Sequence, residues 1–169
     1  MNQSDFLKVV LPFKDKVFRL AKRLLVSTEE AEDATQELLF KLWKSKEKLA
    51  DYNNVEAFAM TMTKNYCYDR LKSKQANNLT LVHNNYKEKE TSLDKKLEYR
   101  DSVNQVHLLI EKLPEQQKII MLLRDIEEYD FDEICKMLDM KPTAVRVALS
   151  RARKKIREEL TKKHNYGVS

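Results

Sequence analysis

The sequence is poor in the residues that make tight turns. Its 169 residues include 1 glycine and 3 prolines. Sheet-rich folds with many tight turns usually need more of both, because glycine supplies left-handed backbone conformations and proline fixes turn geometry. A helical chain has no such need, so the composition favours an all-α fold.

Cysteine and histidine are also scarce, with 2 and 3 copies. Cys67 and Cys135 form no CxxC motif, and the scattered histidines provide no cluster of metal ligands. We interpret both cysteines as small, half-buried hydrophobic residues in a reducing compartment. A Gly-rich phosphate loop and a Ser/His/Asp set are missing as well. We therefore expect no catalytic group, metal, cofactor or small-molecule substrate.

Long hydrophobic runs are absent too, and none reaches the ~18 apolar residues that a membrane span requires. The N-terminus does not resemble a signal peptide. We therefore expect a cytoplasmic protein with no membrane span. Charge is abundant instead, with 35% charged residues and a net charge of +5. This basic balance permits nucleic-acid binding without establishing it.

Hydrophobic periodicity divides the chain into two helical blocks, from about Asp5 to Lys74 and from about Asp101 to Lys163. The polar stretch between them lacks sustained periodicity, which predicts a flexible linker. We assign residues 1–75 to a first small helical domain, 76–100 to the linker and 101–169 to a second helical domain.

Local signals predict where several helices begin or break. Pro12 interrupts the first hydrophobic pattern and predicts a kink or a break there. Ser27 is followed three residues later by Glu30, which is the spacing of a capping box. Asp130 and Glu133 repeat this arrangement, and Pro114 suits the first turn of a helix.

The segment from Phe131 to Lys155 predicts a helix-turn-helix. It contains a short helix, a break around Asp139–Pro142 and a second helix. Cys135 supplies the small residue that is needed where the second helix crosses the first. The hydrophobic residues spaced to join the two helices are Ile134, Leu138, Met140, Val145 and Leu149.

Charge changes sign along this segment. The charged residues between positions 125 and 139 are acidic except for Lys136, whereas those between 141 and 163 are basic except for Glu158 and Glu159. A DNA-recognition helix needs such a basic surface, because its flanks neutralise phosphate while its first turns face base edges. Arg146 lies early on this helix, where an arginine can donate two hydrogen bonds to a guanine. The competing interpretation is a basic, solvated surface helix.

Three stretches resemble the bacterial sigma factors of the sigma-70 family. The stretch that begins at Leu113–Pro114 and ends in Ser150-Arg151-Ala152-Arg153 resembles region 4. Region 2 is resembled by Ala31-Glu32-Asp33-Ala34-Thr35-Gln36-Glu37, followed by Leu38-Leu39-Phe40-Lys41-Leu42-Trp43, and by Phe58–Lys74 (FAMTMTKNYCYDRLKSK). Two such regions with a short linker and no middle domain resemble the extracytoplasmic-function (ECF) subfamily.

The resemblance implies a sigma factor that directs core RNA polymerase to promoters and helps to open them. Its implied partners are core RNA polymerase, promoter DNA in duplex and single-stranded form, and a possible anti-sigma factor. The recognition helix would hold the upstream promoter element as a duplex. Its DNA-binding residues would be Thr143, Arg146, Val147, Ser150, Arg151, Arg153 and Lys154.

This chain departs from the family pattern in two places. Asp139 occupies a turn position where the family often has glycine, and aspartate adopts the left-handed conformation less readily. Val147 and Ala148 stand where the family often has polar or basic residues. The promoter sequence therefore does not follow by analogy.

The helix that follows Ser27 is the expected polymerase-binding element. Acidic residues in its first turn, Glu29 and Glu30, are explained by the helix dipole. The resemblance implies that residues further along dock on a basic coiled coil of the polymerase. These are Asp33, Gln36, Glu37 and Phe40.

The third helix, which begins near Asn53 or Asn54, mixes basic and aromatic residues. Single-stranded DNA binders use this mixture to stack bases and neutralise phosphates. We expect Phe58, Met62 and Tyr66 to pack in the core, while Asn53 and Asn54 suit helix capping as well as base contact. The residues implied in opening DNA and binding the downstream element are Tyr52, Asn53, Asn54, Lys64, Asn65, Tyr68, Arg70, Lys72 and Lys74.

Two other functions fit parts of the sequence. A homodimeric helix-turn-helix regulator of duplex DNA explains the C-terminal half equally well, but it leaves the acidic helix and the basic-aromatic helix unexplained. An all-helical protein-interaction adaptor predicts no salt-sensitive DNA binding. The sequence does not reveal the regulon, the inducing signal, an anti-sigma partner or the arrangement of the two blocks.

Overall fold

The structure of the protein is a computed structural model that describes residues 1–78 and 102–168. Within these ranges every regular element is helical, so the all-α fold is confirmed. The chain divides into two compact units, unit 1 (Met1–Ala76) and unit 2 (Asn77–Ser169). Of the predicted flexible linker, residues 79–100 lie outside the described residues.

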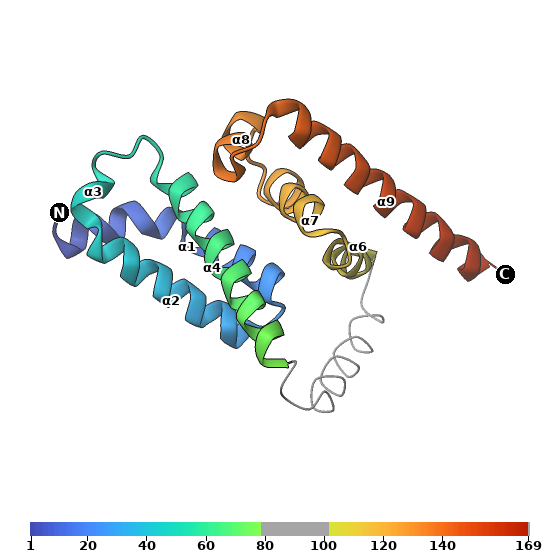
Figure 1. Cartoon of the computed structure of the whole chain (residues 1–169), viewed down its shortest axis with the longest axis horizontal. Helices are drawn as coiled ribbons and strands as arrows, with labels where there is room; N and C mark the ends of the chain where they lie inside the picture. The colour runs from blue at the N-terminus through green and yellow to red at the C-terminus, as the bar shows by residue number, and fades with distance from the viewer. Residues whose placement is uncertain (79–101, 169) are drawn as a thin grey trace. The chain divides into compact units, whose positions relative to one another are not determined.

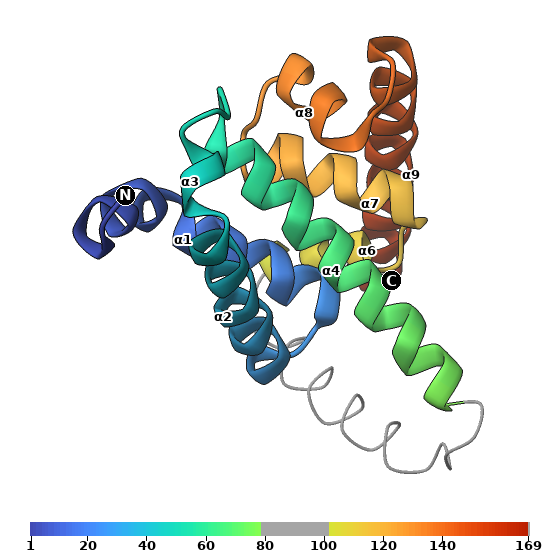
Figure 2. The ribbon, with the colours of Figure 1, turned by 60° about the vertical axis from the view of Figure 1, so that its left-hand side comes forward.

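Unit 1 contains α1 (Gln3–Leu25), α2 (Thr28–Lys44), α3 (Lys46–Leu49) and α4 (Val55–Asn78) (Figures 1 and 2). α1 continues through Pro12 as one helix, so of the predicted kink or break the break is wrong. The short helix α3 was not predicted from the sequence. α1 and α2 form an antiparallel pair, because only two residues connect them.

The connection between α1 and α2 is defined by its caps. Val26 adopts a left-handed conformation with φ 55°, and its N–H donates to the Lys22 carbonyl. The predicted cap at Ser27 is confirmed, since its Oγ accepts a hydrogen bond from the Glu30 N–H at 3.3 Å. These two caps therefore fix the change of chain direction between α1 and α2.

The core of unit 1 lies between α1, α2 and α4. α4 contributes Ala59, Met60, Thr63 and Cys67, whereas Phe58, Met62 and Tyr66 are only half-buried. The prediction that these three residues pack in the core is therefore wrong, because a neighbouring side of α4 faces the core. Thr63 tolerates burial because its hydroxyl donates to the Ala59 carbonyl at 2.7 Å. The other buried residues are Phe6, Val10, Phe13, Val17, Leu20, Ala21, Leu24, Leu25, Ala31, Ala34, Thr35, Leu38, Leu42 and Leu49.

Unit 2 contains α6 (Ser102–Glu111), α7 (Glu115–Met121), the π-helical turn η1 (Leu122–Ile126), α8 (Phe131–Leu138) and α9 (Pro142–Val168). Pro114 occupies the N-cap position immediately before α7, one residue earlier than the predicted place in the first turn. Leu122 and Leu123 are buried within η1, and the Glu127 N–H donates to the Leu122 carbonyl at 3.0 Å. This wider turn was not predicted.

The helix-turn-helix is confirmed in α8 and α9. Asp130 Oδ1 accepts from the Glu133 N–H at 2.8 Å, which is the predicted cap of α8. Asp139 ends α8 in the left-handed conformation with φ 51° and ψ 54°. The Met140 N–H donates to the carbonyl of Cys135, whose side chain is half-buried as expected. The turn therefore has the geometry that a glycine would adopt more easily.

The core of unit 2 joins α9 to the three helices before it. α9 buries Val145, Ala148, Leu149, Ala152 and Ile156, which repeat at three- and four-residue intervals. Ala148, which stands where the family often has a polar or basic residue, is buried in this core. The residues opposite are Leu109, Ile110, Leu113, Ile119, Ile120, Met121, Leu122, Leu123, Tyr129, Ile134 and Met137.

The left-handed turn predicts how substitutions at Asp139 affect stability. We expect Asp139→Val to lower the free energy of unfolding by about 1–2 kcal/mol, because a β-branched residue is strained at positive φ. Asp139→Gly should be at least as stable as the original chain. Urea denaturation followed by circular dichroism measures both variants, and equal stability of the two would contradict the assigned strain.

Candidate functional site

The face of α9 that points away from the core is basic and polar. Six of the seven predicted DNA-binding residues repeat along it at helical spacing, and the seventh, Arg153, lies at its edge. All seven side chains are exposed, including Val147 at 42%. They are Thr143, Arg146, Val147, Ser150, Arg151, Arg153 and Lys154. Because the opposite side of α9 is buried, this face is free to lie against a duplex.

Two arginines of this helix already have partners within unit 2. Arg153 donates two hydrogen bonds to Asp125, at 3.1 and 2.5 Å, and this bonding raises the pKa of Arg153. The guanidinium carbon of Arg146 lies 5.4 Å from the ring centre of Phe131, and that of Arg124 lies 4.6 Å from the same ring. Because the pair with Asp125 is exposed, it contributes under ~1 kcal/mol to stability.

The predicted polymerase-binding residues also share one face. Asp33, Gln36, Glu37 and Phe40 are three, one and three residues apart along α2, and all are exposed. Phe40 has 51% of its surface exposed, which is unusual for a large aromatic side chain. The opposite side of α2 is buried against the core of unit 1. α2 therefore presents an acidic face with one aromatic side chain at its end.

The predicted DNA residues of α4 divide between two faces. Asn65, Tyr68 and Lys72 lie one turn apart on another side of α4, with Lys64 beside them. Asn65 and Lys72 are exposed there, whereas Lys64 and Tyr68 are half-buried and the Tyr68 hydroxyl is buried. Arg70 and Lys74 instead continue the stripe of Thr63 and Cys67, which faces α2. The prediction from the sequence groups these six residues of α4 together. In the structure, Arg70 and Lys74 lie on a different side of the helix from the other four.

The loop before α4 holds one aromatic pair and one cap. The rings of Tyr52 and Phe58 stack with centres 4.4 Å apart, and Tyr52 remains 40% exposed. Asn54 Oδ1 accepts a hydrogen bond from the Ala57 N–H at 3.0 Å, so Asn54 caps α4. Asn53 is exposed beside it. An exposed aromatic ring next to amide groups is suited to stacking an unpaired base.

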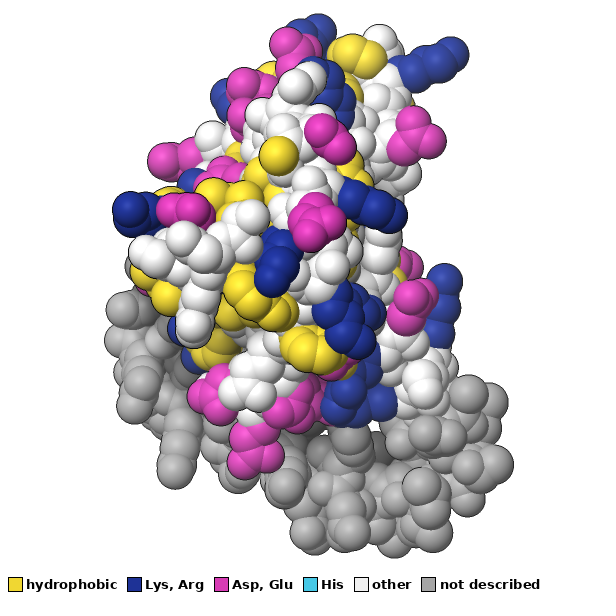
Figure 3. All heavy atoms as spheres, turned by 90° about the vertical axis from the view of Figure 1, so that its left-hand side faces the viewer, with side chains coloured by type: hydrophobic (Ala, Val, Ile, Leu, Met, Phe, Trp, Pro, Cys, Tyr) yellow, Lys and Arg dark blue, Asp and Glu magenta, His cyan; other side chains and the backbone are white. Residues whose placement is uncertain are grey.

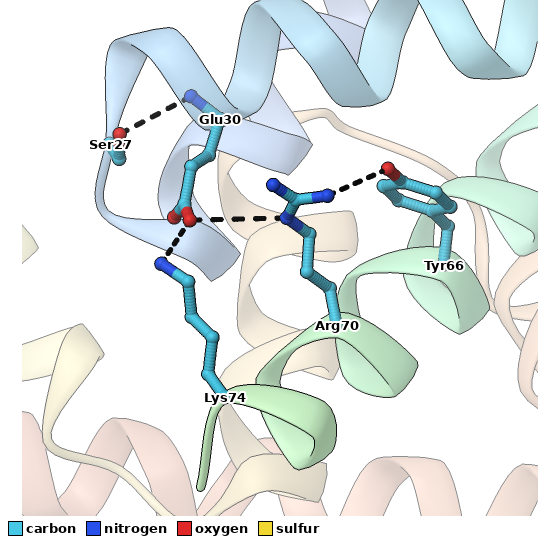
Figure 4. Close-up of polar contacts among 5 residues, drawn as sticks. All are labelled: Ser27, Glu30, Tyr66, Arg70 and Lys74. Carbon is cyan, nitrogen blue, oxygen red and sulfur yellow. Dashed lines mark hydrogen bonds and ion pairs between the residues drawn. The ribbon is translucent and has the colours of Figure 1, made fainter. Parts of the chain in front are cut away.

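Glu30 connects α2 with α4, which the sequence did not predict. Its carboxylate forms ion pairs with Lys74 and with Arg70 Nε, the latter at 3.9 Å (Figure 4). Arg70 also donates to the Tyr66 hydroxyl at 3.3 Å. In the sequence, Glu30 is recognisable only as the glutamate of a capping box. That pattern does not indicate its partners on α4.

Cys67 is a strongly perturbed titratable group of unit 1. Its side chain is fully buried, not half-buried as predicted, and this burial raises the pKa of the thiol to about 12. The positive charge of Arg70 opposes the shift, and the negative charge of Glu30 adds to it. A thiol in this environment stays protonated at neutral pH and is a poor nucleophile.

The surface carries both signs of charge. The face drawn in Figure 3 shows acidic, basic and hydrophobic side chains interspersed. Among residues 1–78 and 102–168, no group of three or more His, Cys, Asp or Glu could hold a metal ion. In the same residues, no helix has the length and apolar character needed to cross a membrane.

The fold and these surfaces define a two-unit helical protein whose second unit is a helix-turn-helix. The chain matches "Sigma-70 region 2" over residues 9–77 and "Sigma-70, region 4" over residues 104–156. It belongs to the ECF sigma factors of the sigma-70 family. Its function is promoter recognition by RNA polymerase and transcription initiation, in which sigma factors are non-catalytic subunits.

Several characterised proteins are similar over most of this chain. The ECF RNA polymerase sigma factor SigW of Bacillus subtilis is 23% identical over 94% of this chain and 90% of the relative. The ECF RNA polymerase sigma factor SigE of Mycolicibacterium smegmatis is 27% identical over 92% of this chain and 61% of the relative. The sigma factor RpoE from Bartonella quintana, solved in complex with the anti-sigma factor NepR, has a similar fold with a TM-score of 0.72. That likeness covers 93% of this chain and 97% of the other at 17% identity.

The environment of the two thiols predicts very different reactivity. In the folded protein at neutral pH we expect Ellman's reagent to modify half-buried Cys135, whereas Cys67 reacts more slowly by orders of magnitude because it is protonated and inaccessible. Single variants Cys67→Ser and Cys135→Ser assign each rate, and unfolding in guanidinium should equalise them. Rapid labelling of native Cys135→Ser would show that Cys67 is not buried as described.

Proposed function

We propose that the two units of this sigma factor bind opposite ends of one promoter while core RNA polymerase performs the chemistry. Residues 1–75 would bind core polymerase and the downstream promoter element, and residues 101–169 would bind the upstream element. The observation that carries this proposal is the exposed basic face of α9, which lies opposite a fully apolar buried face. Residues 76–100 would connect the two functions.

In unit 2, the proposed contacts with duplex DNA come from the exposed face of α9. Arg146 lies in the first turns of the helix, where a side chain reaches base edges in the major groove. Thr143, Val147 and Ser150 follow on the same face, while Arg151 and Lys154 flank it and would neutralise phosphates. Arg153 would contribute only after exchanging Asp125 for a phosphate.

In unit 1, we propose that the face of α2 formed by Asp33, Gln36, Glu37 and Phe40 binds core polymerase. A basic partner surface would neutralise the carboxylates, and the exposed Phe40 ring would be buried on binding. The cation of Lys44 lies 4.5 Å from the centre of that ring, so it is positioned at the edge of the same face.

The proposed contacts with the opened DNA strand lie on α4 and the loop before it. Tyr52 offers a ring for stacking, Asn53 and Asn54 offer amide groups, and Lys64 and Lys72 offer positive charge. Asn65 and Tyr68 lie between these lysines on the same side of α4. Arg70 and Lys74 complete the proposed set from the neighbouring side.

An anti-sigma factor is a further proposed partner. The structural relative RpoE was solved in complex with the anti-sigma factor NepR, and this chain shares its fold. We propose that a protein of this type masks the polymerase-binding face of this chain, and that the chain acts in the cytoplasm with the polymerase. A homodimeric duplex-binding regulator is less consistent with the molecule, because it gives no role to the region 2 match.

Arg146 tests the proposed upstream contact. With core polymerase and a promoter that this chain selects, Arg146→Ala should lower run-off transcription roughly 10- to 100-fold, because a bidentate contact to guanine is worth about 1–3 kcal/mol of discrimination. Arg157→Ala removes an arginine further along α9 and serves as the matched control. Binding to core polymerase should be unchanged in both variants. Normal transcription and promoter preference in Arg146→Ala would remove the assigned contact.

Asp33 and Glu37 test the proposed polymerase contact. Reversing both charges with Asp33→Lys and Glu37→Lys should weaken binding to core polymerase at least tenfold in a titration of labelled core, because like charges would then meet. The control, Asp15→Lys with Glu47→Lys, reverses two exposed charges of unit 1 that lie on α1 and α3, outside this face. Equal affinity of the two double variants would move the polymerase contact elsewhere.

A further inference from the structure

Glu30 lies where the two functional helices of unit 1 meet. It belongs to the first turn of α2, and its carboxylate points toward Arg70 and Lys74 on α4 (Figure 4). Only 16% of the Glu30 side chain is exposed, compared with 38% for Arg70 and 32% for Lys74. The Glu30 carboxylate is therefore bound to two cations of α4 that could otherwise bind a phosphate.

The orientation of this cluster follows from helix geometry. Thr63 and Cys67 are buried, and Arg70 and Lys74 continue their stripe at three- and four-residue intervals. Both cations therefore point toward the start of α2, where Glu30 is located. Lys72 lies on the other side of α4 and is exposed.

The charges of the cluster do not cancel. Two cations share one carboxylate, so the group retains a single positive charge that can attract one phosphate. In the absence of the carboxylate, the same two side chains could neutralise two phosphates. For a single DNA strand, each neutralised phosphate adds about 0.7 to the slope of log affinity against log salt concentration.

We propose that Glu30 is a positioning residue that limits the number of DNA phosphates unit 1 neutralises, by holding Arg70 and Lys74 against α2. This inference rests on the proposed single-strand contact of α4. On this proposal, Glu30 lowers the affinity of the chain for DNA independently of the DNA sequence. A bridge that only stabilised the pair of helices would change the unfolding midpoint and leave the salt slope unaltered.

Glu30→Gln is the most direct test, because it removes the charge and keeps the cap. The hydrogen bond to Ser27 uses the backbone N–H of Glu30, and glutamine is equally suited to the third position of a capping box. The matched control is Glu32→Gln, which removes one exposed carboxylate two residues along and thus on the far side of α2. Both variants change the net charge equally.

The measurement is fluorescence anisotropy of the full-length chain with a labelled single-stranded oligothymidine, over a series of salt concentrations. We expect Glu30→Gln to bind more tightly at low salt than the unaltered chain and to have a slope steeper by about 0.7. Glu32→Gln should keep the original slope.

A second comparison identifies the cation that Glu30 restrains. Lys74→Gln should reduce oligothymidine affinity less than Lys72→Gln in the unaltered chain, because Lys74 is paired and Lys72 is exposed. In the Glu30→Gln background the two losses should become similar. The first half of this comparison needs no substitution at Glu30, so it remains decisive even if Glu30→Gln is unstable.

The results separate this inference from the proposed function. Salt-dependent binding by the unaltered chain, with equal slopes for Glu30→Gln and Glu32→Gln, would overturn the role of Glu30 and leave the α4 contact standing. Equal losses for Lys74→Gln and Lys72→Gln in the unaltered chain would do the same. Lack of oligothymidine binding by every variant would overturn the α4 contact and the role of Glu30 together.

Discussion

Burial of one side of each helix is the constraint on which both functional surfaces depend. In α9, Val145, Leu149 and Ala152 pack into the core, so the cations between them are directed to solvent on the opposite side. In α2, Ala34 and Leu38 do the same for the acidic face. Hydrophobic packing therefore determines where each surface lies, while the polar residues determine what it attracts.

Most of this arrangement could be predicted from the sequence, because it depends on local spacing. The caps at Ser27 and Asp130, the helix-turn-helix, and the single face that carries Asp33 and Glu37 all follow from residues within one or two turns. The family resemblance and the all-α fold were confirmed for the same reason.

The features that could not be predicted depend on longer-range or finer geometry. The partners of Arg70 and Arg153 are carboxylates 40 and 28 positions earlier in the chain, and spacing patterns contain no information on such pairs. The true core face of α4 includes Thr63 and Cys67, whose small side chains give a weaker periodic signal than Phe58 and its aromatic neighbours. The wider turn of η1 arises from a shift in backbone hydrogen bonding, which leaves no mark on composition.

The scarcity of glycine affects the backbone of both units. Within the described residues, three positions with positive φ are occupied by Val26, Glu128 and Asp139, although glycine would be less strained at each. Each of these residues ends a helix or lies in the loop just after one. The surrounding helix contacts must therefore hold these turns in place, which links the local conformation to the tertiary structure.

The two-sided character of α9 also restricts how its length can change during evolution. A single residue inserted between Arg146 and Val147 would rotate everything beyond it by about 100°. Arg151 would then occupy the place of Ala152, and Lys155 that of Ile156, which are both core positions. Substitutions on the outer side of α9 leave the fold intact, so promoter preference can diversify by exchange of residues, whereas insertions are tolerated only beyond the ends of this helix.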